Sequence, residues 1–356
     1  MRGLSREEES EFSLNLNETE LLRRAFGRMV QDDPAAAARF LSHPLSGQEI
    51  DHEPTWIVGL IDRLIVATKG MPEEALARTS AIRAHGLIDD RDTVREHANW
   101  ILVNDDDDTR RLGTLQVMTF IDIADNNWEL ALAHQNEALE IATRLGEKSR
   151  YCKGQAQLGN ILWHMGRGNE ALAAYADAYD YFSQNDPAGS SPVLARAAYG
   201  TALVLATRGD EIDAEPWIQR SKTFAEGSDA AGMATFLDPL AGYVAAVHGH
   251  PKKASQCLSQ GIAASIRRSD QRSLEVAFDF AAAAFAVWGK GGLASALLDL
   301  VQRLRDLNGR PRTVGEAAFA VRIRRIADSN PDAAWLKLDS VAAIARAVLA
   351  ELESGH

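Results

Sequence analysis

Apolar residues recur along this chain at spacings of three and four positions, which place side chains on one face of a helix. Two segments near the amino terminus show this spacing, Leu21, Leu22, Phe26 and Met29, and then Trp56, Leu60, Leu64 and Ile65. No segment indicates a sheet, and the alanine runs at 35–38 and 281–284 suit close helix packing. The pattern therefore predicts an all-α protein.

A second, longer period is superimposed on the first. A turn residue is followed five positions later by alanine at Asn126…Ala131, Gly166…Ala171, Gly209…Ala214, Gly249…Ala254 and Gly289…Ala294. The alanines are 40, 43, 40 and 40 residues apart. A period of this length indicates a repeat protein in which each repeat is a pair of helices.

The repeat around Gly166 shows why the period predicts helix pairs. Gly166 can adopt the left-handed conformation that ends a helix at little steric cost. Gly159 and Ala171 lack bulk where two helices would cross, so the backbones can approach. Leu162 and Tyr175 would fill the volume beside that crossing.

At these positions the chain resembles the tetratricopeptide repeat family, whose signature it matches at Leu158, Gly159, Leu162, Gly166, Ala171, Tyr175 and Ala178. It departs from the family at Gln155 and Ser183, where the signature has tryptophan and proline, and in its period, which is about 34 residues in the family. The longer repeats look like those in sensor domains of bacterial signal-activated transcription regulators and in the light chain of the kinesin motor. The resemblance implies a right-handed superhelical α-solenoid of stacked antiparallel helix pairs.

The resemblance divides the chain into four parts. Residues 1–16 carry several glutamates without helical spacing and predict a disordered tail. Residues 17–109 predict an irregular helical region, and residues 110–309 predict five repeats. Residues 310–356 predict a final helix pair that lacks the signature turn, as expected for a unit that caps a solenoid.

Charge narrows the range of partners. Lysine and arginine number 38 against 50 aspartates and glutamates, a formal net charge of −12. Such a field repels nucleic acid and anionic membranes, and the arginines at 322, 324 and 325 are interpreted as the solvated face of a terminal helix. The two cysteines form no disulfide framework, and no apolar run is long enough to span a membrane. We expect a cytoplasmic protein.

Motifs for catalysis and for cofactors are missing from the sequence, which holds no GxxxxGK[ST], HExxH or GxSxG. His248 and His250 flank a repeat turn, so the turn explains them better than a metal does. The aspartate run 105–108 lacks the ligand spacing of a calcium loop and is interpreted as an acidic loop before a helix. We therefore expect no enzyme activity, no cofactor and no metal.

The candidate binding residues follow from the resemblance, because the first helices of stacked pairs line a concave groove. One face of the first helix around Gly159 carries Lys153, Asn160, Trp163 and His164. The same offsets in the other repeats give Gln116, Phe120, Arg196, Tyr199, Phe236, Tyr243 and Asp279. Amides, aromatic rings and cations of this kind bind the backbone, side chains and carboxylates of a peptide.

Alternatives remain open at this stage. Trp163, Tyr199 and Tyr243 could instead fill gaps between repeats while the polar residues face water. The leading hypothesis is a non-catalytic scaffold or adaptor that binds a protein or peptide, with self-association left open. A second is the ligand- or partner-sensing domain of a signal-dependent transcription regulator whose DNA-binding part lies elsewhere.

The third hypothesis is an enzyme with its site in residues 40–110. Its candidate residues are His43, His52, His85 and the aspartates 105–108. A bound metal, or a buried carboxylate and histidine in contact within one pocket of residues 40–110, would favour it.

Overall fold

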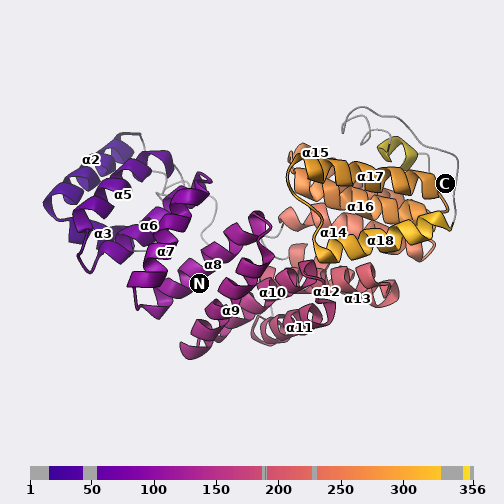
Figure 1. Cartoon of the computed structure of the whole chain (residues 1–356), viewed down its shortest axis with the longest axis horizontal. Coiled ribbons are helices and arrows are strands. Elements are labelled where there is room, and N and C mark those ends of the chain that lie inside the picture. The colour runs from indigo at the N-terminus through magenta and orange to yellow at the C-terminus, as the bar shows by residue number, and fades with distance from the viewer. Residues whose placement is uncertain are drawn as a thin grey trace. The chain divides into compact units, whose positions relative to one another are not determined.

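The computed structural model describes residues 16–42, 54–186, 189, 191–226, 231–329 and 348–352. All regular secondary structure in these ranges is helical (Figure 1), which confirms the predicted all-α class. Contacts between Cα atoms divide the chain into two units, Met1–Ile121 and Asp122–His356. No helix within the described ranges is both long enough and apolar enough to cross a membrane.

The first unit begins with a helical bundle around a core that includes Phe26, Ile57, Ile61 and Leu64. Its helices are α2 (Leu16–Asp32), α3 (Pro34–Leu41), α5 (Pro54–Thr68), α6 (Glu74–Leu87) and α7 (Arg91–Asn104), and α8 (Asp108–Ala124) runs across the boundary between the units. The aspartate run ends α7 and begins α8, and the Asp107 carboxylate accepts a hydrogen bond from the Arg110 backbone N–H at 2.9 Å. The run therefore has the place before a helix that its charge predicts.

The second unit consists of consecutive helix hairpins. Its helices are α9 (Trp128–Arg144), α10 (Lys148–His164), α11 (Gly168–Asn185), α12 (Pro192–Arg208), α13 (Glu211–Glu226), η1 (Ala231–Met233), α14 (Ala234–Val247), α15 (Pro251–Arg267), α16 (Gln271–Val287), α17 (Gly291–Leu307) and α18 (Val314–Asp328). Consecutive helices form the pairs α10 with α11, α12 with α13, α14 with α15 and α16 with α17, and first helices of neighbouring pairs also pack together, as α14 does with α16. Stacked pairs of this kind form an α-solenoid.

The five turn residues all lie between two helices and have positive φ, from 59° at Asn126 to 112° at Gly209. The five alanines that follow them are 0% exposed. A side chain this small and fully buried lets the second helix of a pair lie close to its neighbours.

Tyr175 shows how small residues and one large ring share the space between helices. A Cβ atom at Gly159 of α10 would lie 2.8 Å from the Tyr175 ring, and one at Gly200 of α12 would lie 2.1 Å from it. The phenol ring, 2% exposed, therefore needs glycine on both sides. The sequence predicts the first of these glycines but not the second.

Several predicted segments lie wholly or partly outside the described residues. These are the tail up to residue 15, the histidines His43 and His52, and most of the second helix of the final pair. The domain boundary at residues 109 and 110 stays a prediction.

Candidate functional site

Helix α18 lies against the first helices of the repeats in the second unit. It packs on α16 and α17 and reaches α10, four repeats earlier along the chain. Phe319 of α18 packs against Tyr243 of α14 and Phe280 of α16, with ring centroids 5.7 and 5.4 Å apart. Figure 1 shows α18 beside α14 and α16. The face predicted to form a binding groove therefore already holds a helix of the same chain.

The start of α18 lies close against the end of α10. A Cβ atom at Gly315 would lie 2.2 Å from the carbonyl oxygen of Trp163, so only glycine fits. Two residues before it, Thr313 caps α18 and shares a capping box with Glu316. The Thr313 hydroxyl oxygen also lies 3.1 Å from Nδ1 of His164.

Replacing Gly315 by alanine is expected to lower the free energy of unfolding by about 1–3 kcal/mol, because the new methyl group must push α18 away from a backbone oxygen. Urea unfolding measures the change, and hydrogen exchange of the α18 amides locates it. Gly113→Ala in α8 is the matched control, because a Cβ atom there meets nothing within 4 Å. Equal stability of the two variants would contradict the close contact.

Arg305 of α17 joins α18 to α16 through buried charges. Its guanidinium lies 2.8 Å from the Glu316 carboxylate and 3.6 Å from that of Glu275, and its side chain is 5% exposed. Burial alone would raise the pKa of Glu316, but the charge and hydrogen bonds of Arg305 outweigh burial and hold this pKa at about 2. Arg312 forms a second such pair with Asp279 of α16, where burial raises the carboxyl pKa.

Arg322 attaches the middle of α18 to α12–α14. Its Nη1 donates to the Tyr243 hydroxyl at 2.7 Å and to the Ala206 carbonyl at 3.3 Å, and Nη2 pairs with the buried Glu211 carboxylate. The interpretation of this arginine as solvated is therefore wrong. Helical phase alone could not reveal that the carboxylate and hydroxyl of distant repeats lie beside it.

The candidate groove residues fall into covered and open sets. His164 and Tyr243 are buried, and Asp279 is buried in its pair with Arg312. Trp163 is half-buried and its Nε1 donates to the Thr207 hydroxyl at 3.2 Å. The structure therefore brings the last turns of α10, α12 and α14 and the middle of α16 together around α18.

The open set lies nearer the beginnings of the first helices. Lys153 and Arg196 are exposed, and Asn160, Tyr199 and Phe236 are half-buried. In the first unit, Gln116 is half-buried and Phe120 is 57% exposed, both on α8. Whether these side chains bind a partner stays a prediction.

Sequence reasoning missed the residues of α18 that occupy the face, Thr313, Gly315, Glu316, Phe319 and Arg322. The sequence Thr313-Val-Gly-Glu316 is a capping-box signature and could have located the start of this helix. No sequence signal indicates that the helix would contact repeats more than a hundred residues earlier.

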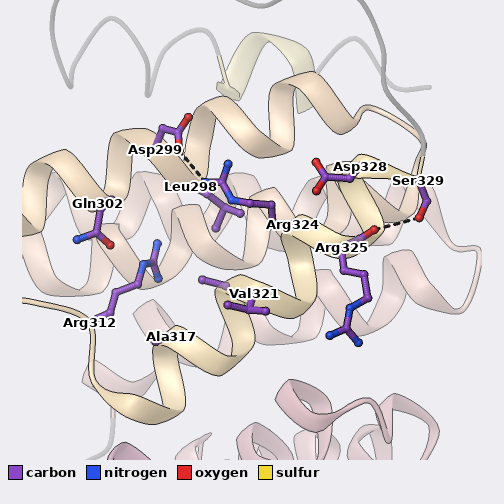
Figure 2. Close-up of a pocket in the computed structure, with 11 residues that line it drawn as sticks. Leu298, Asp299, Gln302, Arg312, Ala317, Val321, Arg324, Arg325, Asp328 and Ser329 are labelled. Atoms are coloured by element: carbon purple, nitrogen blue, oxygen red, sulfur yellow. Dashed lines mark hydrogen bonds and ion pairs between the residues drawn. The ribbon is translucent and has the colours of Figure 1, made fainter.

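Two cavities flank α18 in the described part of the second unit. One, of about 450 Å³, lies against α10 and α12 and is lined by residues including Trp163, Asn169, Thr207, Arg208, Arg322 and Arg325. The other, of about 760 Å³, lies between α17 and α18. Figure 2 shows Arg324 reaching Asp299 at its edge, an exposed pair 2.6 Å apart. Both cavities present arginine side chains from α18.

The first unit contains a separate cluster of histidines and carboxylates. His85 of α6 is buried, with Nδ1 3.0 Å from the Asp90 carboxylate and Nε2 3.4 Å from that of Asp62 on α5. His97 of α7 is also buried, and its Nδ1 lies 3.0 Å from Nη1 of Arg78. Burial, and then the positive charge of Arg78, lower the pKa of His97.

This cluster does not meet the condition set for the enzyme hypothesis, because the Asp62 and Asp90 side chains beside the buried His85 are 54% and 38% exposed. Asp105 is instead held by Arg110, whose Nη2 donates to it at 3.0 Å. What the cluster offers chemically is a set of nitrogen and oxygen ligands.

No family model matches the chain, and no curated protein sequence does either. Among solved structures, aspartyl phosphate phosphatase F from Bacillus subtilis is similar with a TM-score of 0.53 and 13% identity, covering 96% of this chain and 100% of that one. A Rap protein complexed with competence and sporulation factor is similar with a TM-score of 0.49 and 15% identity, covering 88% of this chain and 98% of that one. BtubC from P. vanneervenii is similar with a TM-score of 0.40 and 14% identity, covering 90% of this chain and 98% of that one. At these identities the first similarity shows the fold alone, a helical-repeat fold of the tetratricopeptide type.

Proposed function

We propose that the chain is a non-catalytic scaffold that binds an acidic segment of a protein partner on the open stretch of the second unit. The open stretch is defined by Lys153, Asn160 and Arg196 together with the cavity of about 450 Å³ beside Trp163. The observation that carries the proposal is the packing of α18 against the first helices of the repeats. A face that binds one helix through arginines, carboxylates and an aromatic cluster has the chemistry to bind a further segment.

Helix phase supports an open stretch on the side where α18 lies. On α10, Lys153 and Asn160 precede His164 by eleven and four residues, spacings that keep one face. His164 contacts Thr313 at the start of α18. On α12, Arg196 precedes Thr207 by eleven residues, and Thr207 lines the cavity beside α18. A partner segment bound there would continue along the face that α18 covers.

Charge selects the partner. Lys153 and Arg196 have no ion pair within the described ranges, and Arg325 is exposed at the cavity. These cations contrast with the net charge of −12 of the whole chain. Cations at an interface raise the association rate of an acidic partner and repel basic ones. An acidic segment is therefore the best complement, and nucleic acid is disfavoured by the overall field.

A photo-crosslinking amino acid at position 160 of the full chain tests the proposal in extract of the native cell. Position 173, exposed on the second helix α11, is the matched control site. We expect a protein crosslinked from position 160 and absent from position 173, with an acidic segment at the crosslink. Equal crosslinking from both positions would contradict the proposal.

The crosslinked segment, made as a peptide, then measures the part played by charge. We expect the double variant Lys153→Glu, Arg196→Glu to bind it about tenfold more weakly, with the difference shrinking at high salt. Both side chains are exposed, so the fold should be unaffected. The same affinity in wild type and variant would place the peptide elsewhere.

A further inference from the structure

We propose that Asp62, His85 and His97 form a zinc site that joins α5, α6 and α7 in the first unit. One ligand atom from each residue lies within 4.8 Å of the others. Two imidazoles and one carboxylate are a ligand set that zinc takes in open sites, where water fills the remaining position. The proposal concerns the first unit and is independent of the function proposed for the second.

The distance between two of these ligand atoms fits a tetrahedral zinc ion. Nε2 of His85 and Oδ1 of Asp62 are 3.4 Å apart. Two ligand atoms at about 2.1 Å from zinc, in tetrahedral geometry, are separated by about 3.4 Å. An ion can therefore bind between them without a change in their separation.

Asp90 orients His85 for this role. Its carboxylate lies 3.0 Å from Nδ1 of His85, and the same side chain caps α7 by accepting from the Thr93 N–H. A carboxylate that accepts from Nδ1–H leaves the lone pair of Nε2 free and fixes the ring plane, which is the arrangement found behind many metal-bound histidines. The helix cap and the ring contact together place Nε2 towards Asp62.

Arg78 is the competitor for His97. Its Nη1 lies 3.0 Å from Nδ1 of His97, and its side chain also pairs with the buried Glu74 and stacks on Trp100. If Nδ1 binds the ion, it cannot accept from Arg78; if Nε2 binds the ion, Nδ1 carries the proton and again cannot accept. Zinc binding through either nitrogen therefore requires Arg78 to leave His97, so arginine and metal exclude one another at this ring.

Isothermal titration of the untagged, chelator-treated full chain with zinc chloride tests the site. We expect one ion per chain and a higher thermal midpoint with zinc than without it. Asp62→Asn, at an exposed side chain, and His97→Gln should each weaken binding by at least about tenfold, and Asp90→Asn, which keeps the helix cap, by about tenfold. The visible spectrum of the cobalt(II)-loaded chain should show tetrahedral nitrogen and oxygen ligation.

Two further variants make the result decisive. Arg78→Met should tighten zinc binding, because the competitor is removed, and an unchanged affinity would overturn the part assigned to His97. His250→Gln changes the exposed histidine at the turn after α14 and should leave binding unaltered. Absence of stoichiometric binding by wild type, or loss of binding in His250→Gln instead of His97→Gln, would overturn the proposal.

Discussion

Arg305→Ala is expected to lower the free energy of unfolding by about 3–5 kcal/mol, the range measured when one partner of a buried ion pair is removed. Arg305 is 4% exposed, and it faces the carboxylates of Glu316, Glu275 and Asp279. Without the arginine, these buried carboxylates must ionise without their shared cation or take up protons. Urea unfolding of the second unit, followed by circular dichroism, measures the loss.

Arg303 on the same helix provides the matched control. It is exposed and has no ion pair within the part of the chain that the structure describes, so Arg303→Ala should change the free energy of unfolding by less than about 0.5 kcal/mol. Similar losses in the two variants would mean that helix propensity, and not the buried charge cluster, decides the effect.

Because of His164, the free energy of unfolding is expected to fall by about 3 kcal/mol between pH 7.5 and pH 4.5. Burial lowers its pKa from 6.5 to about 3, because the ring is enclosed by Trp128, Trp163 and Thr313. Below pH 6.5 the unfolded chain binds a proton that the folded chain does not. Stability conferred by the neutral ring is therefore present above pH 6.5 and falls progressively as the pH approaches 3.

The measurement is a comparison of pH dependences. In His164→Gln the difference in unfolding free energy between the two pH values should be about 3 kcal/mol smaller than in wild type, whatever the stability of the variant at pH 7.5. His250→Gln, at an exposed position, should keep the wild-type difference. If the unfolding free energy of His164→Gln falls as much between the two pH values as that of wild type, other groups cause the acid sensitivity.

The helix pairs could be predicted from sequence because their determinants are local. A glycine such as Gly166 has positive φ where a helix ends, and the alanine five residues later is buried against the neighbouring helix. Each repeat contains the same two signals, so chance is a poor explanation for their phase. Gly200 of α12 was missed because its partner, Tyr175, lies in the preceding repeat.

The candidate site was harder to predict because the repeat period gives only the helix face of each residue. It does not indicate which residues on that face are covered by α18. Lys153 and His164 share one face of α10, yet the first is exposed and the second is buried. His164 is covered by Trp128 and Trp163 and also by Thr313, which no repeat offset includes. His85 was named from the sequence, but its neighbours Asp62 and His97 were missed, since they lie 35 residues apart on different helices.

The packing of α18 against distant repeats also affects how the second unit folds. In an ordinary repeat array each repeat contacts only its neighbours, so the ends can unravel while the middle stays folded. Here the Thr313–His164 contact spans 149 residues and the Arg322–Glu211 pair spans 111. Such contacts form only when the intervening repeats are in place, which raises contact order and slows folding. They also couple the stability of repeats that are not adjacent, so these repeats unfold cooperatively instead of one by one.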